Sequence, residues 1–157
     1  MVAARRARGF TLPELLAGVA VMAILATVAA PSFSELIAGQ RVKSAASDVF
    51  ASLLRTRSEA IKRNTAITLS PADEGWASGW NIAHPTDGDI LLDDHGAITG
   101  ATIDGPSSVT YLPNGRLSGT TAPSFDIEVD GSSQRRCVEI DLSGRPYQKP
   151  TACVPAQ

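Results

Sequence analysis

The sequence predicts an α+β fold in which one long N-terminal helix packs on a small antiparallel β-sheet. The first 63 residues contain a continuous apolar run and then apolar residues at spacings of three and four, which is typical of a helix. From residue 64 onward, short apolar runs alternate with turn residues, which is typical of antiparallel strands. A chain of 157 residues is long enough for one domain of modest core beyond the N-terminal segment.

A short basic segment, residues 1–9, precedes the apolar run and contains three arginines. The run itself, residues 10–30, contains Glu14 as its only charged residue. As a helix it would be about 31 Å long, close to the hydrocarbon thickness of a bilayer. The run therefore predicts a membrane-spanning helix. An acid inside such a segment is costly without a partner, so Glu14 is a functional candidate.

A partner for this acid would arise if the chain were cut after Gly9, because Phe10 would then carry a free α-amine. The pattern Gly9-Phe10-Thr11-Leu12-Pro13-Glu14-Leu15-Leu16, behind a basic leader, resembles the class III signal of type IV prepilins and pseudopilins. The resemblance implies that a prepilin peptidase removes residues 1–9 and methylates the new N-terminal Phe10. It also implies that Glu14 guides assembly into a filament by pairing with the amine of a neighbouring subunit.

Two other interpretations account for less of the pattern. An ordinary secretory signal also starts with basic residues, but its apolar core usually has only about 7–15 residues. Small residues at Ala29-Ala30 resemble its cleavage site, although Pro31 follows directly. A plain membrane anchor would leave Glu14 unexplained. Pro31 also predicts a kink, because proline removes a helical hydrogen bond.

Residues 31–63 predict the amphipathic half of the same helix, with one apolar stripe packed on the domain that follows. The charged residues of this segment mostly occupy the other face, and Lys62, Arg63 and Asn64 predict the helix end. The apolar stripe consists of Val42, Ala45, Ala46, Val49, Phe50, Leu53, Leu54, Ala60 and Ile61.

Residues 64–157 predict a single β-rich domain. Asn114-Gly115 and Asp130-Gly131 are typical hairpin turns. Apolar residues alternate in the last two expected strands, which therefore form a half-buried antiparallel hairpin. The expected strands are residues 66–69, 79–83, 90–92, 98–103, 109–112, 125–129 and 138–142.

The sequence Trp76-Ala77-Ser78-Gly79-Trp80, followed by an aspartate-rich turn and Ile90-Leu91-Leu92, resembles the GspH/FimT family. This family contains minor pseudopilins of type II secretion and minor pilins of type IV pili. The resemblance implies a structural subunit that joins other major and minor pilins or pseudopilins, and starts or caps a filament at its tip. The sequence leaves the choice between the two machines open. For the two tryptophans themselves we expect core packing.

The basic leader favours a cytoplasmic N-terminus, because cytoplasmic flanks of membrane helices are rich in Lys and Arg. The chain would then cross the inner membrane once and carry its C-terminal domain in the periplasm. In that oxidising compartment we expect Cys137 and Cys153 to form a disulfide, with two free thiols as the alternative. In the chain-entropy model, closing a loop of this size contributes about 3 kcal/mol.

The sequence contains no catalytic motif of the esterase, phosphate-loop or metalloprotease type, so we expect no enzyme and no cofactor or metal. Without the three arginines of residues 1–9, the 14 basic residues fall to 11 against 16 acidic ones. This balance argues against extensive nucleic-acid binding but allows a local basic patch.

The C-terminal segment predicts such a patch and with it an alternative function, DNA binding for uptake in natural transformation. Basic side chains neutralise phosphates and an aromatic ring can stack on an exposed base. Gly144-Arg145 also resembles the start of a Gly-Arg-x-Arg tail that binds DNA in some FimT-like pilins, although Tyr147 occupies the second arginine position. The candidate residues are Arg135, Arg136, Arg145, Tyr147 and Lys149.

Overall fold

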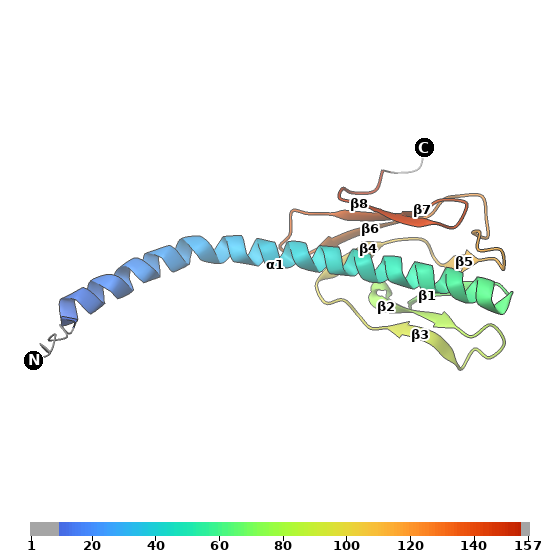
Figure 1. Cartoon of the computed structure of the whole chain (residues 1–157), viewed down its shortest axis with the longest axis horizontal. Coiled ribbons are helices and arrows are strands. Elements are labelled where there is room, and N and C mark those ends of the chain that lie inside the picture. Colours follow the sequence, from blue (N-terminus) through green and yellow to red (C-terminus); the bar gives the residue numbers. More distant parts are fainter. Residues whose placement is uncertain (1–9, 155–157) are drawn as a thin grey trace, which may run out of the picture.

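A single helix, α1 (Leu12–Arg63), dominates the molecule (Figure 1). This computed structural model describes residues 10–154, apart from the side chains of residues 28–32. The predicted leader, residues 1–9, lies outside the described residues. With 52 residues α1 is about 78 Å long. We call residues 12–37 the stalk and residues 38–154 the head, because Ala38 is the first buried residue of the helix. The predicted long helix is confirmed.

Local sequence explains both ends of α1. Thr11 is extended, and its N–H donates to Glu14 Oε2 at 3.5 Å across the first turn. The helix ends at Arg63, and the following residue, Asn64, caps it in the left-handed conformation with φ 53°. Between these ends the helix is continuous through Pro31 and curves gently instead of breaking (Figure 1).

The stalk exposes most of its apolar side chains. Within the described part of the chain, no helical stretch combines the length and the hydropathy that crossing a membrane requires. The predicted spanning segment, residues 10–30, includes three residues whose side chains are not described, and it stays a prediction.

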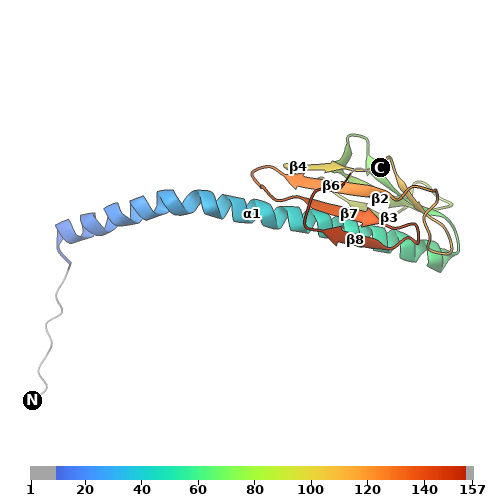
Figure 2. The same cartoon turned by 90° about the horizontal axis from the view of Figure 1, so that it is seen from above.

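The head is built of antiparallel β-structure, so the predicted α+β fold is confirmed, and its strands form two sheets where the sequence predicted one. In the first sheet the order is β3-β2-β1-β5, and in the second it is β4-β6-β7-β8. Figure 2 shows α1 running beside β7 and β8 of the second sheet. The strands are β1 (Ile67–Ala72), β2 (Gly75–Ala83), β3 (Leu91–His95), β4 (Ala101–Asp104), β5 (Val109–Tyr111), β6 (Ser124–Val129), β7 (Arg136–Ile140) and β8 (Pro146–Lys149).

Helix and sheets share one core. Every second residue of β6 is buried, from Phe125 to Val129, and β7 pairs with it in antiparallel register, so the predicted hairpin is confirmed. In the predicted stripe of α1, Phe50 is partly buried and the other residues up to Leu53 are buried, as is Ala60. Leu54 and Ile61 are 41% and 52% exposed, so their assignment to the stripe was wrong.

Both tryptophans pack in this core, as expected. Trp76 and Trp80 are 4% and 2% exposed. The indole N–H of Trp80 donates to Ser52 Oγ of α1 at 2.8 Å, which satisfies both buried polar groups. His95 of β3 stacks on the Trp80 ring, with centroids 4.0 Å apart. The hydrogen bond from Trp80 therefore joins the first sheet to the helix, and the stacked ring of His95 packs on Trp80 within that sheet.

Candidate functional site

The first turn of α1 places Glu14 on an apolar surface. Phe10, Leu15 and Met22 lie beside it around a shallow hollow of about 370 Å³. Phe10 is 84% exposed. No basic group forms an ion pair with Glu14 among residues 10–154. A carboxylate in apolar surroundings is stabilised by a cationic partner. The Glu14 carboxylate is therefore placed to bind an amine that comes from outside the described residues. Gly9, the other half of the predicted cleavage site, is not described.

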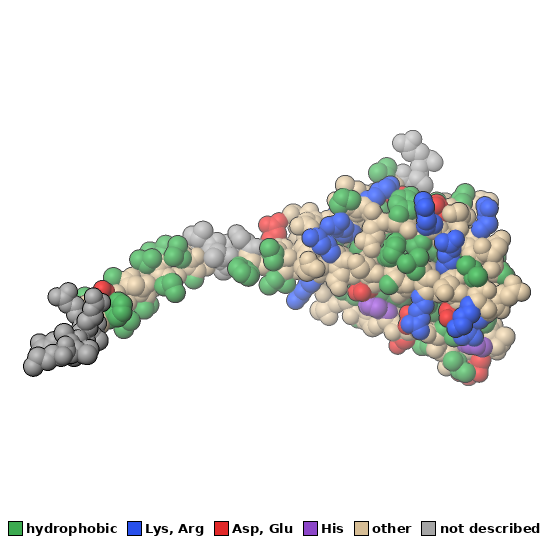
Figure 3. Space-filling view, in the orientation of Figure 1, with side chains coloured by type: hydrophobic (Ala, Val, Ile, Leu, Met, Phe, Trp, Pro, Cys, Tyr) green, Lys and Arg blue, Asp and Glu red, His purple; other side chains and the backbone are tan. Residues whose placement is uncertain are grey.

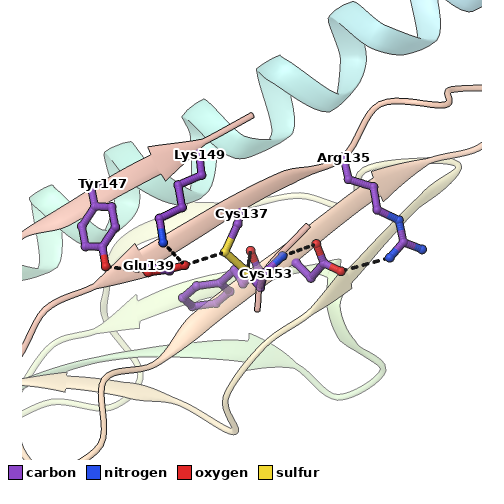
Figure 4. The surroundings of a disulfide bond; sticks show 8 residues. Arg135, Cys137, Glu139, Tyr147, Lys149 and Cys153 are labelled. Carbon is purple, nitrogen blue, oxygen red and sulfur yellow. Dashed lines mark hydrogen bonds and ion pairs between the residues drawn. A yellow bond between two sulfur atoms is a disulfide. The ribbon is translucent and has the colours of Figure 1, made fainter. Parts of the chain in front are cut away.

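The second candidate region is the β7–β8 hairpin with the segment that follows it (Figure 4). Cys137 lies opposite Lys149 in the ladder. Cys137 forms a disulfide with Cys153, with 4.9 Å between their Cα atoms, so the predicted pairing is confirmed. The Cys153 N–H also donates to Asp126 Oδ1 at 3.3 Å. The disulfide therefore ties the chain after β8 to the outer surface of the second sheet.

Acidic neighbours neutralise most of the predicted basic patch. Arg135 forms ion pairs with Asp126, at 3.2 Å, and with Glu128, both on the adjacent strand β6. Lys149 Nζ lies 2.7 Å from Glu139 Oε1. Arg145 Nε lies 3.8 Å from Asp141 Oδ2.

Tyr147 is also held by an acid, as Figure 4 shows. Its hydroxyl donates to Glu139 Oε2 at 2.5 Å, and this hydrogen bond raises the pKa of Tyr147. The hydrogen bonds from Lys149 and Tyr147 hold the pKa of Glu139 below its usual range, and the bond to Glu139 raises the pKa of Lys149. The Lys149 ammonium and the Tyr147 hydroxyl both donate hydrogen bonds to the Glu139 carboxylate. Phosphate binding or base stacking at these residues would have to displace these contacts.

The strand register also separates the candidate residues. Arg135 directly precedes β7 and Arg136 is its first residue, beside the end of β8, whereas Arg145 precedes β8 at the opposite end of the ladder. The five residues do not form one continuous basic surface. The alternative of DNA binding by this segment is therefore not supported.

Gly144 has a structural explanation that the sequence motif did not reveal. Its φ is 83°, and a Cβ at this position would overlap the carbonyl oxygen of Gly115. Arg57 of α1 joins the same two turns, because its guanidinium donates to the carbonyl oxygens of Gly115, at 3.0 Å, and Ser143, at 3.4 Å. Sequence reasoning identified the Asn114-Gly115 turn but not its contact with the β7–β8 turn, for which the sequence carries no local signal.

Two known protein families match this chain, one over the head and one over the N-terminal segment. The family described as "Type II transport protein GspH" matches residues 45–144. The family described as "Prokaryotic N-terminal methylation motif" matches residues 4–30. A search of curated proteins found no match.

Two similar solved structures are crystal structures of the type IV minor pilin FimU from Pseudomonas aeruginosa strain PAO1. In one, the identity is 29% and the TM-score 0.60, over 69% of this chain and 92% of that chain. In the other, the identity is 27% and the TM-score 0.63, over 71% and 90%. The minor pseudopilin EpsH of the Vibrio cholerae type 2 secretion system shares the fold, with 14% identity and a TM-score of 0.56 over 70% of this chain and 97% of that chain.

Proposed function

We propose that this chain, which belongs to the GspH family of type II transport proteins, is a minor subunit that starts or caps a type IV pilus or a type II secretion pseudopilus. It would be a structural protein that acts by contact with other pilins or pseudopilins.

The exposed stalk carries the proposal. Nine large apolar side chains between Phe10 and Leu25 are 56–84% exposed in the isolated chain. Burying one such side chain fully is worth roughly 1.5–3 kcal/mol, so this surface needs lipid or neighbouring helices to cover it. Movement of the stalk from a bilayer into a filament core would explain why its apolar side chains are exposed in the isolated chain.

Processing would prepare the stalk for this transfer. A prepilin peptidase would cut between Gly9 and Phe10 and methylate the new amine, which agrees with the N-terminal methylation motif matched over residues 4–30. Glu14 would then pair with the amine of a neighbouring subunit. Before assembly the chain would cross the inner membrane once, with its head in the periplasm. The Cys137–Cys153 disulfide supports this location, because disulfides persist in oxidising compartments.

The two named structural relatives bear on whether the chain belongs to a type IV pilus or to a type II secretion pseudopilus. FimU is named as a type IV minor pilin, and EpsH as a type 2 secretion pseudopilin. The identity of 29% to FimU against 14% to EpsH favours a type IV pilus for this chain. In either machine the partners would be other major and minor subunits.

Replacing the acid tests the assembly function. We expect Glu14→Leu to insert into membranes at the wild-type level but to be depleted from sheared filaments, because an apolar residue suits lipid and cannot pair with an amine. Thr27→Val is the matched control, since it removes a polar group from the same helix without removing a charge. Both fractions are measured by immunoblot. Equal amounts of Glu14→Leu and Thr27→Val in filaments would contradict the role of Glu14.

A further inference from the structure

Arg136, the first residue of β7, is a half-buried cation without a counter-charge. It lies on the same face of the strand as Val138 and Ile140, which are fully buried. Its Nε is buried and has no hydrogen-bond partner. In the described part of the chain its guanidinium takes part in no ion pair.

This situation differs from that of the neighbouring bases. Arg135 and Lys149 point to the other face of the sheet, where carboxylates pair with both (Figure 4). Buried polar groups are normally hydrogen-bonded, and a partly buried charge is normally paired. Arg136 is thus a basic residue of the second sheet that has no acidic partner among residues 10–154.

The surface around Arg136 is hollowed. One hollow, of about 430 Å³, is lined by Ser133, Gln134, Arg136 and Thr151 among others. Arg135 also lines it, but its guanidinium is paired with Asp126 and Glu128 of β6. A second, of about 440 Å³, lies against α1, shares Gln134 with the first and includes Lys43, which also has no ion pair in the described residues. Glu35 lines the second hollow, but it accepts a hydrogen bond from Ser133 at 2.5 Å.

We propose that Arg136, with Lys43 in the adjoining hollow, binds an aspartate or glutamate side chain of an adjacent subunit in the filament. The proposal builds on the function proposed above and names a contact that such a filament would make. A guanidinium presents a planar fork of donors that matches a carboxylate, and the Gln134 amide and Thr151 hydroxyl offer further donors at the rim. A carboxylate from the adjacent subunit would supply the hydrogen-bond partner that Arg136 Nε lacks among residues 10–154.

The position along α1 favours a protein carboxylate over a lipid phosphate. Figure 3 shows basic side chains where the stalk meets the head, as well as others farther along the head. Gly39, which lines the second hollow, lies about 14 Å along the helix from residue 30, the end of the expected membrane segment. Headgroups extend only about 5–8 Å beyond the hydrocarbon on each side. The hollows therefore lie beyond the bilayer surface, at the level where neighbouring heads meet.

Thermal unfolding of the full-length chain in detergent tests the missing partner. The expected result for Arg136→Met is an unfolding midpoint equal to or higher than that of the wild type, because an uncompensated charge is removed. Arg135→Met is the matched control, and its midpoint should be equal to or lower than that of the wild type because its charge is paired. A lower midpoint for Arg136→Met than for Arg135→Met would overturn the proposal, since it would show a compensating group within the chain.

Assembly in cells tests the partner. Arg136→Met should be depleted at least about tenfold from sheared filaments relative to Arg135→Met, with partial recovery in Arg136→Lys. A photo-crosslinking residue at Thr151 should attach the chain to another filament subunit, and Arg136→Met should abolish this product. Normal filament levels of Arg136→Met, or a crosslink to lipid, would overturn the proposal. If neither the wild type nor Arg135→Met reaches filaments, the proposed function fails as well.

Discussion

Replacing Gly144 by alanine gives a quantitative test of the close contact between its turn, in the second sheet, and the Gly115 turn, in the first sheet. Gly144 has φ 83°, and an added Cβ would overlap the Gly115 carbonyl oxygen and lie 3.1 Å from Tyr111 Cε1. The left-handed backbone costs a residue with a side chain roughly 1–2 kcal/mol. Forcing the two turns apart adds roughly 1–3 kcal/mol, the usual range for overpacking. We therefore expect Gly144→Ala to lose about 3 kcal/mol of the free energy of unfolding.

Gly131→Ala separates the two contributions. Its φ is 78°, close to that of Gly144, but the nearest atom to an added Cβ is the Cβ of Ala38 at 4.0 Å. This control should lose only the backbone contribution, roughly 1–2 kcal/mol.

Tryptophan fluorescence follows unfolding of the head in the full-length protein, because both tryptophans are buried there. For a domain of this size 1 kcal/mol corresponds to about 4–6 °C, so we expect the midpoint to fall by about 12–18 °C in Gly144→Ala and about 4–12 °C in Gly131→Ala. Equal losses in the two variants would refute the close contact between the turns.

Two further predictions concern the C-terminal hairpin. In protein recovered from the periplasm, Cys137 and Cys153 should resist alkylation under denaturing conditions until a reductant is added, and labelling without reductant would show free thiols. The pKa of Glu139 is lowered by Lys149 and Tyr147, so its contribution to stability is present above its unfolded pKa, about 4.3, and is lost as the pH falls through the lower folded value. Lys149→Met should therefore weaken the loss of stability in this acidic range, measured as unfolding midpoint against pH, and an unchanged acid profile would contradict the pairing.

Features set by neighbouring residues could be predicted from the sequence, and features set by pairing of distant segments could not. The spacing of apolar residues predicted α1 as far as Arg63, since helical contacts are local. The strand β8 was missed, because it begins at Pro146, is short and lacks apolar alternation. The division into two sheets depends on which strands pair, and no local pattern records that choice.

The same distinction applies to the candidate site. The disulfide could be predicted because it requires only two cysteines and an oxidising compartment. The basic patch was overestimated, because the acids that neutralise Arg135 lie on β6 and become its neighbours only through strand register. Arg57 was not identified, since the two turns that it joins are far apart in the sequence.

The most direct test of the proposed function is the mass of the N-terminal peptide from chains recovered in sheared filaments. We expect a peptide that begins at Phe10 and carries one additional methyl group on its amine. Gly9→Val should abolish both the peptide and the filament-bound chain, because the added side chain would obstruct a cleavage site that accepts glycine. A filament-bound chain that begins at Pro31, or one that retains residues 1–9, would contradict cleavage between Gly9 and Phe10 before assembly.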